Sequence, residues 1–131
     1  MTPHARILVT GASGFIGSAV CPALAAAGFD VRAASRAATG DLASFDRWDD
    51  LLAEVDCVVH LANLAHVSAA EIARARELNV EATGRLAQAA AERGVRRFIY
   101  LSSVKAEAGQ AREDAYGALK AEAEHRLAAI Q

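Results

Sequence analysis

Three glycines near the start of this chain constrain its fold more than any other feature. Residues 7–17 read ILVTGASGFIG, with Gly11, Gly14 and Gly17 between a short apolar run and an alanine-rich amphipathic segment. A tight turn that leads from a strand into a helix has no room for Cβ atoms at these places. The free N–H groups and the positive dipole end of such a helix attract anions. The segment predicts a site for the pyrophosphate of a dinucleotide, although a plain turn also collects glycines.

Length and charge limit the classes of protein to which the chain can belong. A chain of 131 residues suits a single domain with a real core. Its net charge of −2 offers no basic field to nucleic acid. No apolar run approaches the length of a membrane span, and the N-terminus lacks the pattern of a signal peptide. Cys21 and Cys57 show no ligand spacing, so we expect reduced thiols in a cytoplasmic protein.

Strand-like and helix-like segments alternate along the chain. The expected strands are residues 6–10, 30–35, 57–61 and 97–102, and the expected helices are about 14–27, 48–54, 69–93 and 114–130. The near-continuous apolar character of the third strand is typical of a parallel strand buried on both faces. The alternation predicts an α/β fold, a Rossmann-like doubly wound parallel sheet of about four strands in the order 3-2-1-4, with helices on both faces.

Several short motifs follow one another in an order that resembles a single family. They are TGASGFIG at 10–17, GDL at 40–42, HLAN at 60–63, NV at 79–80, FIYLSS at 98–103 and YGALK at 116–120. With them the sequence resembles the extended short-chain dehydrogenase/reductases, the NAD(P)-dependent sugar epimerase, dehydratase and reductase group. Members of that family continue into a C-terminal substrate domain. The resemblance implies that residues 1–131 are a single NAD(P)-binding domain, the cofactor-binding half of such an enzyme.

The resemblance also implies the cofactor contacts residue by residue. The pyrophosphate cradle would be formed by Gly11, Ser13, Gly14, Phe15, Ile16 and Gly17. Asp41 and Leu42 match positions beside the adenine, and Leu61, Ala62 and Asn63 would line the cofactor after the third strand. Asn79 matches a family asparagine that braces the active-site region; the alternative is an asparagine on a helix surface.

Arg36 bears on the choice between NAD and NADP. The second strand ends where a carboxylate would accept the 2′-hydroxyl of NAD, yet this chain has Ala34-Ser35-Arg36. A guanidinium group can hold a phosphate through two charge-assisted hydrogen bonds. We therefore expect NADP rather than NAD, the alternative being that Arg36 is a solvated surface residue.

Ser103, Tyr116 and Lys120 form the expected catalytic group. Tyr116 and Lys120 are four residues apart, so their side chains share one face of a helix. A nearby ammonium favours the phenolate, which lets a tyrosine exchange a proton near neutral pH. The resemblance implies that Tyr116 and Lys120 also contact the cofactor, Lys120 through the nicotinamide ribose, and that Ser103 hydrogen-bonds the substrate oxygen. The same spacing also occurs by accident on surface helices.

Two functional interpretations follow. The first is an epimerase or reductase that transfers a hydride at a sugar carbon of a nucleotide-sugar-like substrate, with Tyr116 as acid/base. Val104 and Lys105 stand where the dehydratases of the family carry an Asp-Glu pair, so dehydration is not expected. The alternative is a non-catalytic dinucleotide-binding or redox-sensing module. A metal-dependent hydrolase is disfavoured because the histidines at positions 4, 60, 66 and 125 lack ligand spacing.

The last two long helices bear on self-association. In the family that the chain resembles, the segments that correspond to Glu81–Arg93 and Ala115–Ile130 commonly pair across a two-fold axis. Their apolar stripes recur at helical spacing and would supply an isologous interface if they were exposed. The stripe residues are Leu86, Ala90, Leu119, Ala123 and Leu127. Two alternatives follow. Either the stripes form a homodimer interface, or they face the chain's own sheet.

Overall fold

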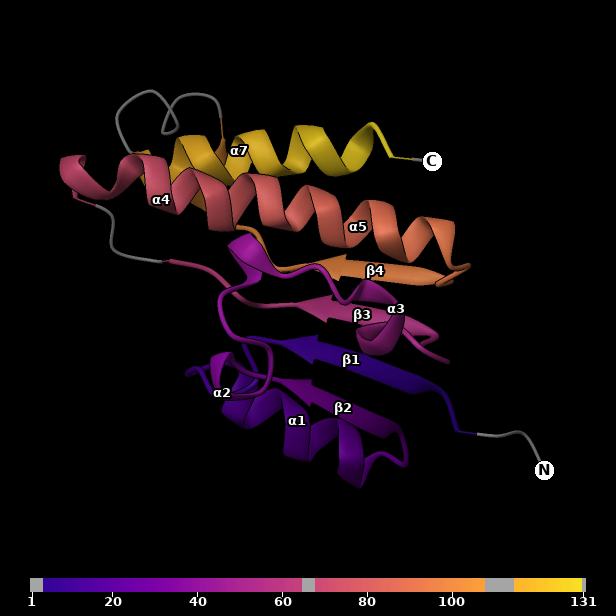
Figure 1. Ribbon diagram of the computed structural model, residues 1–131. Helices are drawn as coiled ribbons and strands as arrows, with labels where there is room; N and C mark the ends of the chain where they lie inside the picture. Colours follow the sequence, from indigo (N-terminus) through magenta and orange to yellow (C-terminus); the bar gives the residue numbers. More distant parts are fainter. Residues whose placement is uncertain (1–3, 65–67, 108–114, 131) are drawn as a thin grey trace.

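Four parallel strands form one sheet in the computed structural model, which describes residues 4–64, 68–107 and 115–130. The strands are β1 (Arg6–Thr10), β2 (Asp30–Ala34), β3 (Cys57–His60) and β4 (Arg97–Tyr100) (Figure 1). Each lies within two residues of its expected position, because a short apolar run between turn residues marks a strand locally. The predicted α/β class is confirmed.

The order of the strands differs from the predicted order. The sheet runs β2-β1-β3-β4 rather than 3-2-1-4, and Ile7 of β1 lies opposite Cys57 of β3. Between β2 and β3 the chain forms only α2 (Arg36–Thr39), a 3-10 turn at Leu42–Ser44 and α3 (Trp48–Leu51). Leu52 and Val55 then pack into the core with Leu8 of β1. This packing draws the connection back over β1, so β3 pairs on the far side of β1 and not with β2.

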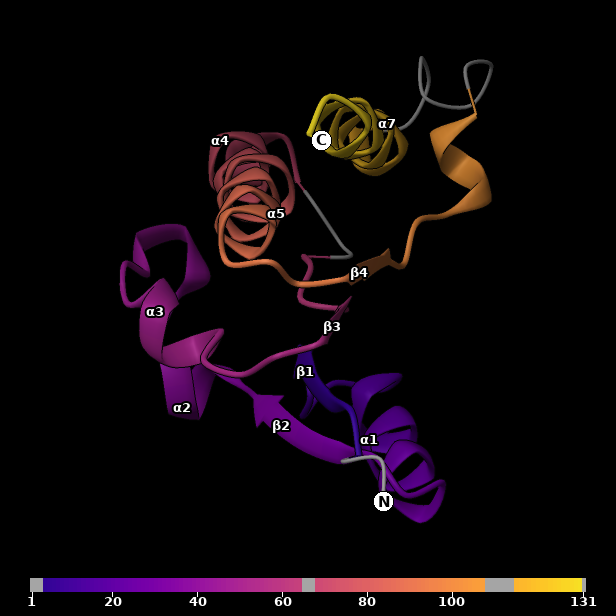
Figure 2. The same cartoon turned by 90° about the vertical axis from the view of Figure 1, so that its right-hand side faces the viewer.

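Helices cover the sheet from both sides, as predicted. They are α1 (Gly17–Ala26), α4 (Ile72–Arg76), α5 (Thr83–Glu92) and α7 (Ala115–Ala128), and a π-helical stretch at Glu77–Ala82 joins α4 to α5. In Figure 2, α1 lies on one face of the sheet and α3 and α5 lie on the other, with α7 beside α5. Among the described residues, no helix combines the length and apolar character needed to cross a membrane.

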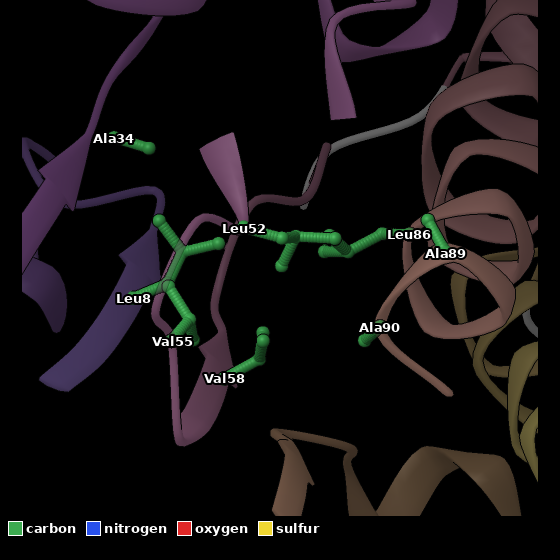
Figure 3. Close-up of a cluster of buried hydrophobic side chains, with 8 residues drawn as sticks. All are labelled: Leu8, Ala34, Leu52, Val55, Val58, Leu86, Ala89 and Ala90. Carbon is green, nitrogen blue, oxygen red and sulfur yellow. The ribbon is translucent and has the colours of Figure 1, made fainter. Parts of the chain in front are cut away.

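The main core lies on the face of the sheet that α3 and α5 cover. Figure 3 shows its members, which are Leu8, Ala34, Leu52, Val55, Val58, Leu86, Ala89 and Ala90. Burying one such leucine or valine contributes about 1.5–3 kcal/mol to stability. The core therefore holds α5 and the connection after α3 against the two central strands.

Most of the apolar stripe residues on α5 and α7 are covered by the chain's own elements, which is the second of the two alternatives. Leu86, Ala90, Leu119 and Ala123 are buried within one chain, and Leu127 is half-buried. The reason is that α5 faces the sheet and α7 packs against α5 and the π-helical stretch. A homodimer through these helices stays a prediction.

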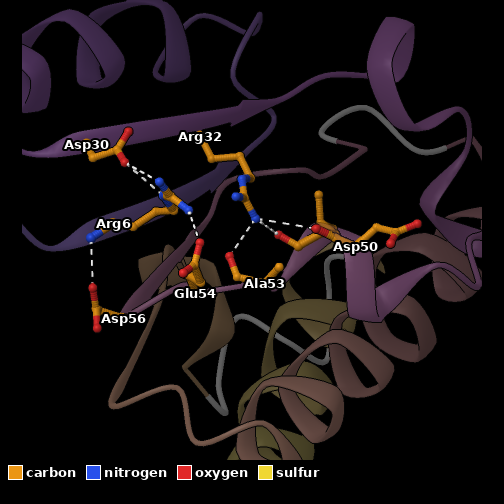
Figure 4. Close-up of polar contacts among 8 residues, drawn as sticks. Arg6, Asp30, Arg32, Asp50, Ala53, Glu54 and Asp56 are labelled. Carbon is orange, nitrogen blue, oxygen red and sulfur yellow. Dashed lines mark hydrogen bonds and ion pairs between the residues drawn. The ribbon is translucent and has the colours of Figure 1, made fainter.

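Polar contacts fix the amino ends of the strands. Figure 4 shows the guanidinium of Arg6 between Asp30 and Glu54, with its Nε 2.8 Å from Asp30 Oδ2. The backbone N–H of Arg6 donates to Asp56 just before β3, over 2.8 Å. Arg32 of β2 donates to the carbonyl of Leu51, the last residue of α3, and to that of Ala53, each over 2.9 Å. These contacts hold the connection between β2 and β3 against the amino ends of the strands, at the end of the sheet opposite the glycine loop.

Candidate active site

The glycine loop joins β1 to α1, and its three glycines have different surroundings. Gly11 has a φ of +64°, and a Cβ there would lie 2.7 Å from the backbone nitrogen of Ala62. A Cβ on Gly17 would overlap the carbonyl oxygen of Gly11. A Cβ on Gly14 would lie 3.3 Å from that same oxygen, close to an ordinary contact. Gly11 and Gly17 are therefore required by the packing of the loop's backbone, and Gly14 is not.

A pocket of about 240 Å³ opens at the carboxyl ends of β1, β2 and β3. Parallel α/β sheets bind ligands at such an edge. Its lining includes eight predicted cofactor residues: Gly11, Ser13, Gly14, Arg36, Asp41, Leu42, Ala62 and Asn63. The other predicted cofactor residues are not among the lining residues: Phe15, Ile16, Gly17, Leu61, Tyr116 and Lys120. The Phe15 side chain is 95% exposed. The structure thus brings together residues from three separate motifs, and Arg36 after β2, around one cavity.

The carboxylate of Asp41 makes two contacts in the part of the pocket where the resemblance implied that the adenine would bind. Its Oδ1 accepts a hydrogen bond from the backbone of Ala43 over 3.0 Å. Its Oδ2 pairs with the guanidinium of Arg74 from α4 over 3.2 Å. Arg74 lines the pocket together with Arg36, and sequence reasoning did not find it. Its only sequence signal is a cation on a helix, which is too common to single it out.

Asn79 clamps the loop that leaves β3. Its Oδ1 accepts from the backbone N–H of Leu64 over 2.9 Å, and its Nδ2 donates to the carbonyl of Leu64 over 3.0 Å. Asn79 is 1% exposed, so the alternative of an asparagine on a helix surface is wrong. The side chain lies in the π-helical stretch, a geometry that is frequent at functional sites.

Tyr116 and Lys120 share one face of α7, as their spacing predicted. The Nδ2 of Asn63 donates to the hydroxyl of Tyr116 over 3.3 Å, which joins the pocket to this helix. Lys120 is 4% exposed, and its Nζ donates to the carbonyl of Leu101 over 2.6 Å. The same Nζ lies 4.5 Å from the ring centre of Tyr100 and 5.8 Å from that of Tyr116. Burial lowers the pKa of Lys120 to about 8.

Ser103 lies in the turn after β4. Its Oγ accepts a hydrogen bond from the backbone of Lys105 over 3.2 Å, which starts a 3-10 turn at Val104–Ala106. A Cβ on Gly117 would overlap the carbonyl oxygen of Lys105, so glycine is required for α7 to approach this turn. The turn that carries Ser103 thus packs against the residue that follows Tyr116.

Sequence reasoning missed a buried polar cluster beneath the loop after β3. Thr10 and His60 end two neighbouring strands, and Thr83 begins α5. The signal was weak, since each is one polar residue at the end of a helix or strand.

In the part of the chain that the structure describes, no three His, Cys, Asp or Glu side chains gather as metal ligands do. His66 lies outside the described residues.

Known proteins resemble this chain in sequence and in structure. Residues 7–128 match the NAD dependent epimerase/dehydratase family. The chain is 33% identical to a UDP-glucose 4-epimerase of Vibrio cholerae over an alignment of 152 positions, which covers 95% of this chain and 46% of that protein. It is also 33% identical to the solved structure of MoeE5 in complex with UDP-glucose and NAD, with a TM-score of 0.82 over 94% of this chain and 48% of that one.

A second solved structure extends this result. A short-chain dehydrogenase/reductase superfamily protein from Agrobacterium tumefaciens, with bound NAD, is 30% identical, with a TM-score of 0.81 over 93% of this chain and 44% of that one. The chain therefore spans about half the length of the relatives that it matches. Because the family match covers almost the whole of it, the chain belongs to the NAD-dependent epimerase/dehydratase family.

Proposed function

We propose that this chain supplies the dinucleotide-binding and proton-transfer half of an NAD(P)-dependent epimerase or reductase acting on a nucleotide sugar. One observation carries the proposal: Asn63 lines the pocket and also donates a hydrogen bond to the hydroxyl of Tyr116. A dinucleotide in the pocket would therefore lie next to a group that can exchange a proton.

The residues present fit a dinucleotide. Gly11 and Gly17 bring the loop backbone close together, and Gly14 lines the pocket without a side chain, where a pyrophosphate would lie against backbone N–H groups. Ser13 of the same loop also lines the pocket, and Ala62 would line the cofactor next to Asn63. Asp41 and Leu42 would contact the adenine. When bound, the nicotinamide ring accepts or donates a hydride.

Tyr116 is the proposed acid/base. It would take the proton of a sugar hydroxyl when that carbon is oxidised, and return it when the carbonyl is reduced. Lys120 would favour the phenolate of Tyr116 through its charge and would hold the nicotinamide ribose. Ser103 would hydrogen-bond the reacting oxygen of the substrate.

Burial of Lys120 favours an enzyme over a non-catalytic module. Removing an ammonium from water costs free energy, which appears here as its lowered pKa. The carbonyl of Leu101 and the ring face of Tyr100 offset part of that cost. A module that only binds a dinucleotide would use Lys120 to hold the ribose but has no need for a cation that favours the phenolate of Tyr116.

Relatives support the substrate class, and Arg36 supports the choice of cofactor. The Vibrio cholerae relative is a UDP-glucose 4-epimerase, and MoeE5 was solved with UDP-glucose, so we propose a nucleotide sugar as the substrate. The two solved relatives contain NAD. We nevertheless propose NADP for this chain, because Arg36 lines the pocket at the end of β2, where a carboxylate would be expected for NAD.

Cytoplasmic location stays a proposal that rests on Cys21 and Cys57, which are free thiols.

The experiment compares the unmodified protein with Tyr116→Phe, using calorimetry for the dinucleotide and a turnover assay with UDP-glucose. The variant should bind NADPH with nearly unchanged affinity, because Asn63 and the pocket are retained. Its turnover should fall by about 10²–10⁴-fold, the usual contribution of a general acid/base. Equal turnover would contradict the role of Tyr116. Dinucleotide binding without turnover in the unmodified protein would favour the non-catalytic module.

A further inference from the structure

Three buried side chains are joined by hydrogen bonds beneath the loop that links the pocket to Tyr116. Thr10 Oγ1 lies 2.6 Å from His60 Nδ1, and His60 Nε2 lies 2.8 Å from Thr83 Oγ1. The exposed fractions of Thr10, His60 and Thr83 are 0%, 1% and 0%. The three side chains come from β1, β3 and α5, so the hydrogen bonds link two strands and a helix.

The positions of the protons follow from the partners of Thr10. Its Oγ1 accepts from the backbone N–H of Leu61 over 3.0 Å and from that of Ala62 over 3.2 Å. A hydroxyl oxygen has two lone pairs, and both are used, so its own proton is donated to Nδ1 of His60. His60 is then the neutral tautomer with its proton on Nε2, and it donates to Thr83.

A charged His60 would break this arrangement. A proton on Nδ1 would face a hydroxyl oxygen whose lone pairs are already occupied. Burial and the ammonium of Lys120 on α7 lower the pKa of His60 to about 3. The aromatic residues that face the ring, Phe98 and Tyr100 of β4, supply no counter-charge. His60 thus remains neutral throughout the physiological range.

The orientation of Thr10 determines where the loop lies. Its oxygen holds the N–H groups of Leu61 and Ala62 at the start of the loop, and Asn79 holds Leu64 at the end. Asn63, which donates to Tyr116, lies between these two anchors. Without the acceptor on His60, the hydroxyl proton of Thr10 loses its partner, and the oxygen is free to rotate away from the loop.

We infer that His60 is a positioning residue which, through Thr10, fixes the backbone of Leu61 and Ala62 and so holds Asn63 against Tyr116. The inference rests on the proposed function only for its catalytic consequence. The hydrogen-bonded chain and the loop that it anchors can be measured without turnover.

Two variants of nearly equal size separate this role from simple core filling. His60→Asn retains an acceptor at the place of Nδ1, whereas His60→Leu removes it, and both leave Thr83 without its donor. In His60→Leu, the amides of Leu61 and Ala62 should exchange with solvent about tenfold faster relative to Val58, the equivalent of one lost hydrogen bond. Its kcat should fall by a similar factor with KM unchanged. His60→Asn should stay within about threefold of the unmodified protein in both measurements.

Nitrogen NMR of the unmodified protein gives a test that needs no variant to fold. The expected spectrum shows His60 with its proton on Nε2 and no titration between pH 4.5 and pH 8. A proton on Nδ1, or a titration in that range, would overturn the inference. Equal amide exchange in the two variants would also overturn it and leave His60 as core filling. Exchange that differs as expected in a protein without turnover would retain the anchoring role and refute the proposed function alone.

Discussion

Replacing Gly17 with alanine tests whether the glycine loop is determined by contacts within its own backbone. The new Cβ would overlap the carbonyl oxygen of Gly11 and would lie 2.8 Å from two backbone atoms of Ala12. No rotation of a side chain relieves a contact with backbone. Gly14 is the matched control, because its Cβ would lie 3.3 Å from the oxygen of Gly11 and needs a shift of only a few tenths of an ångström.

The two variants should differ clearly in stability. Overpacking against a fixed neighbour costs up to about 3 kcal/mol. Alanine has a better helix propensity than glycine by up to about 1 kcal/mol, and Gly17 is the first residue of α1. Gly17→Ala should therefore lower the free energy of unfolding by about 2 kcal/mol, or the melting temperature by about 8 °C in a domain of this size. Gly14→Ala should change it by less than about 0.5 kcal/mol.

Urea unfolding followed by tryptophan fluorescence measures this difference. The chain has one tryptophan, Trp48, and it packs against the main core. A Gly17→Ala variant as stable as the unmodified protein would refute the reasoning from backbone overlap. Gly14→Val should fold but should lose dinucleotide binding in calorimetry, since its branched side chain would enter the pocket. Retained binding by that variant would mean that the glycines serve only a turn.

Three further predictions concern the cofactor, pH and association. NADPH should bind more tightly than NADH, and Arg36→Asp should reduce or invert that preference; equal affinities in the unmodified protein would contradict the proposal of NADP. Since the pKa of His60 is about 3 when folded and 6.5 when unfolded, the free energy of unfolding should fall as pH decreases from 6.5 to 3, by about 1.4 kcal/mol per pH unit. Urea titrations should show a weaker dependence in His60→Asn, and identical slopes would refute this origin. If α5 and α7 form a homodimer, sedimentation at micromolar concentration should show a dimer that dissociates in Leu127→Glu, whereas a concentration-independent monomer would exclude it.

Local features of this protein could be predicted from its sequence. The glycine loop, the four strands and the shared face of Tyr116 and Lys120 each depend on a few neighbouring residues. Turn geometry, the two-residue repeat of a strand and the i,i+4 spacing of a helix operate over that range. The glycine spacing predicted a pyrophosphate site at Gly11, Gly14 and Gly17; the first two line a pocket and Gly17 does not.

Tertiary structure decided the remaining features, because they depend on contacts between distant segments. The strand order depended on Leu52 and Val55, which pack against Leu8 more than 40 residues earlier and draw β3 to the far side of β1. An apolar stripe has the same period whether it faces a partner or its own sheet, so only packing could show that Leu86 is buried. The role of His60 was also hidden, because a buried hydrogen bond needs both partners in place, and Thr10 and Thr83 are 50 and 23 residues away along the chain.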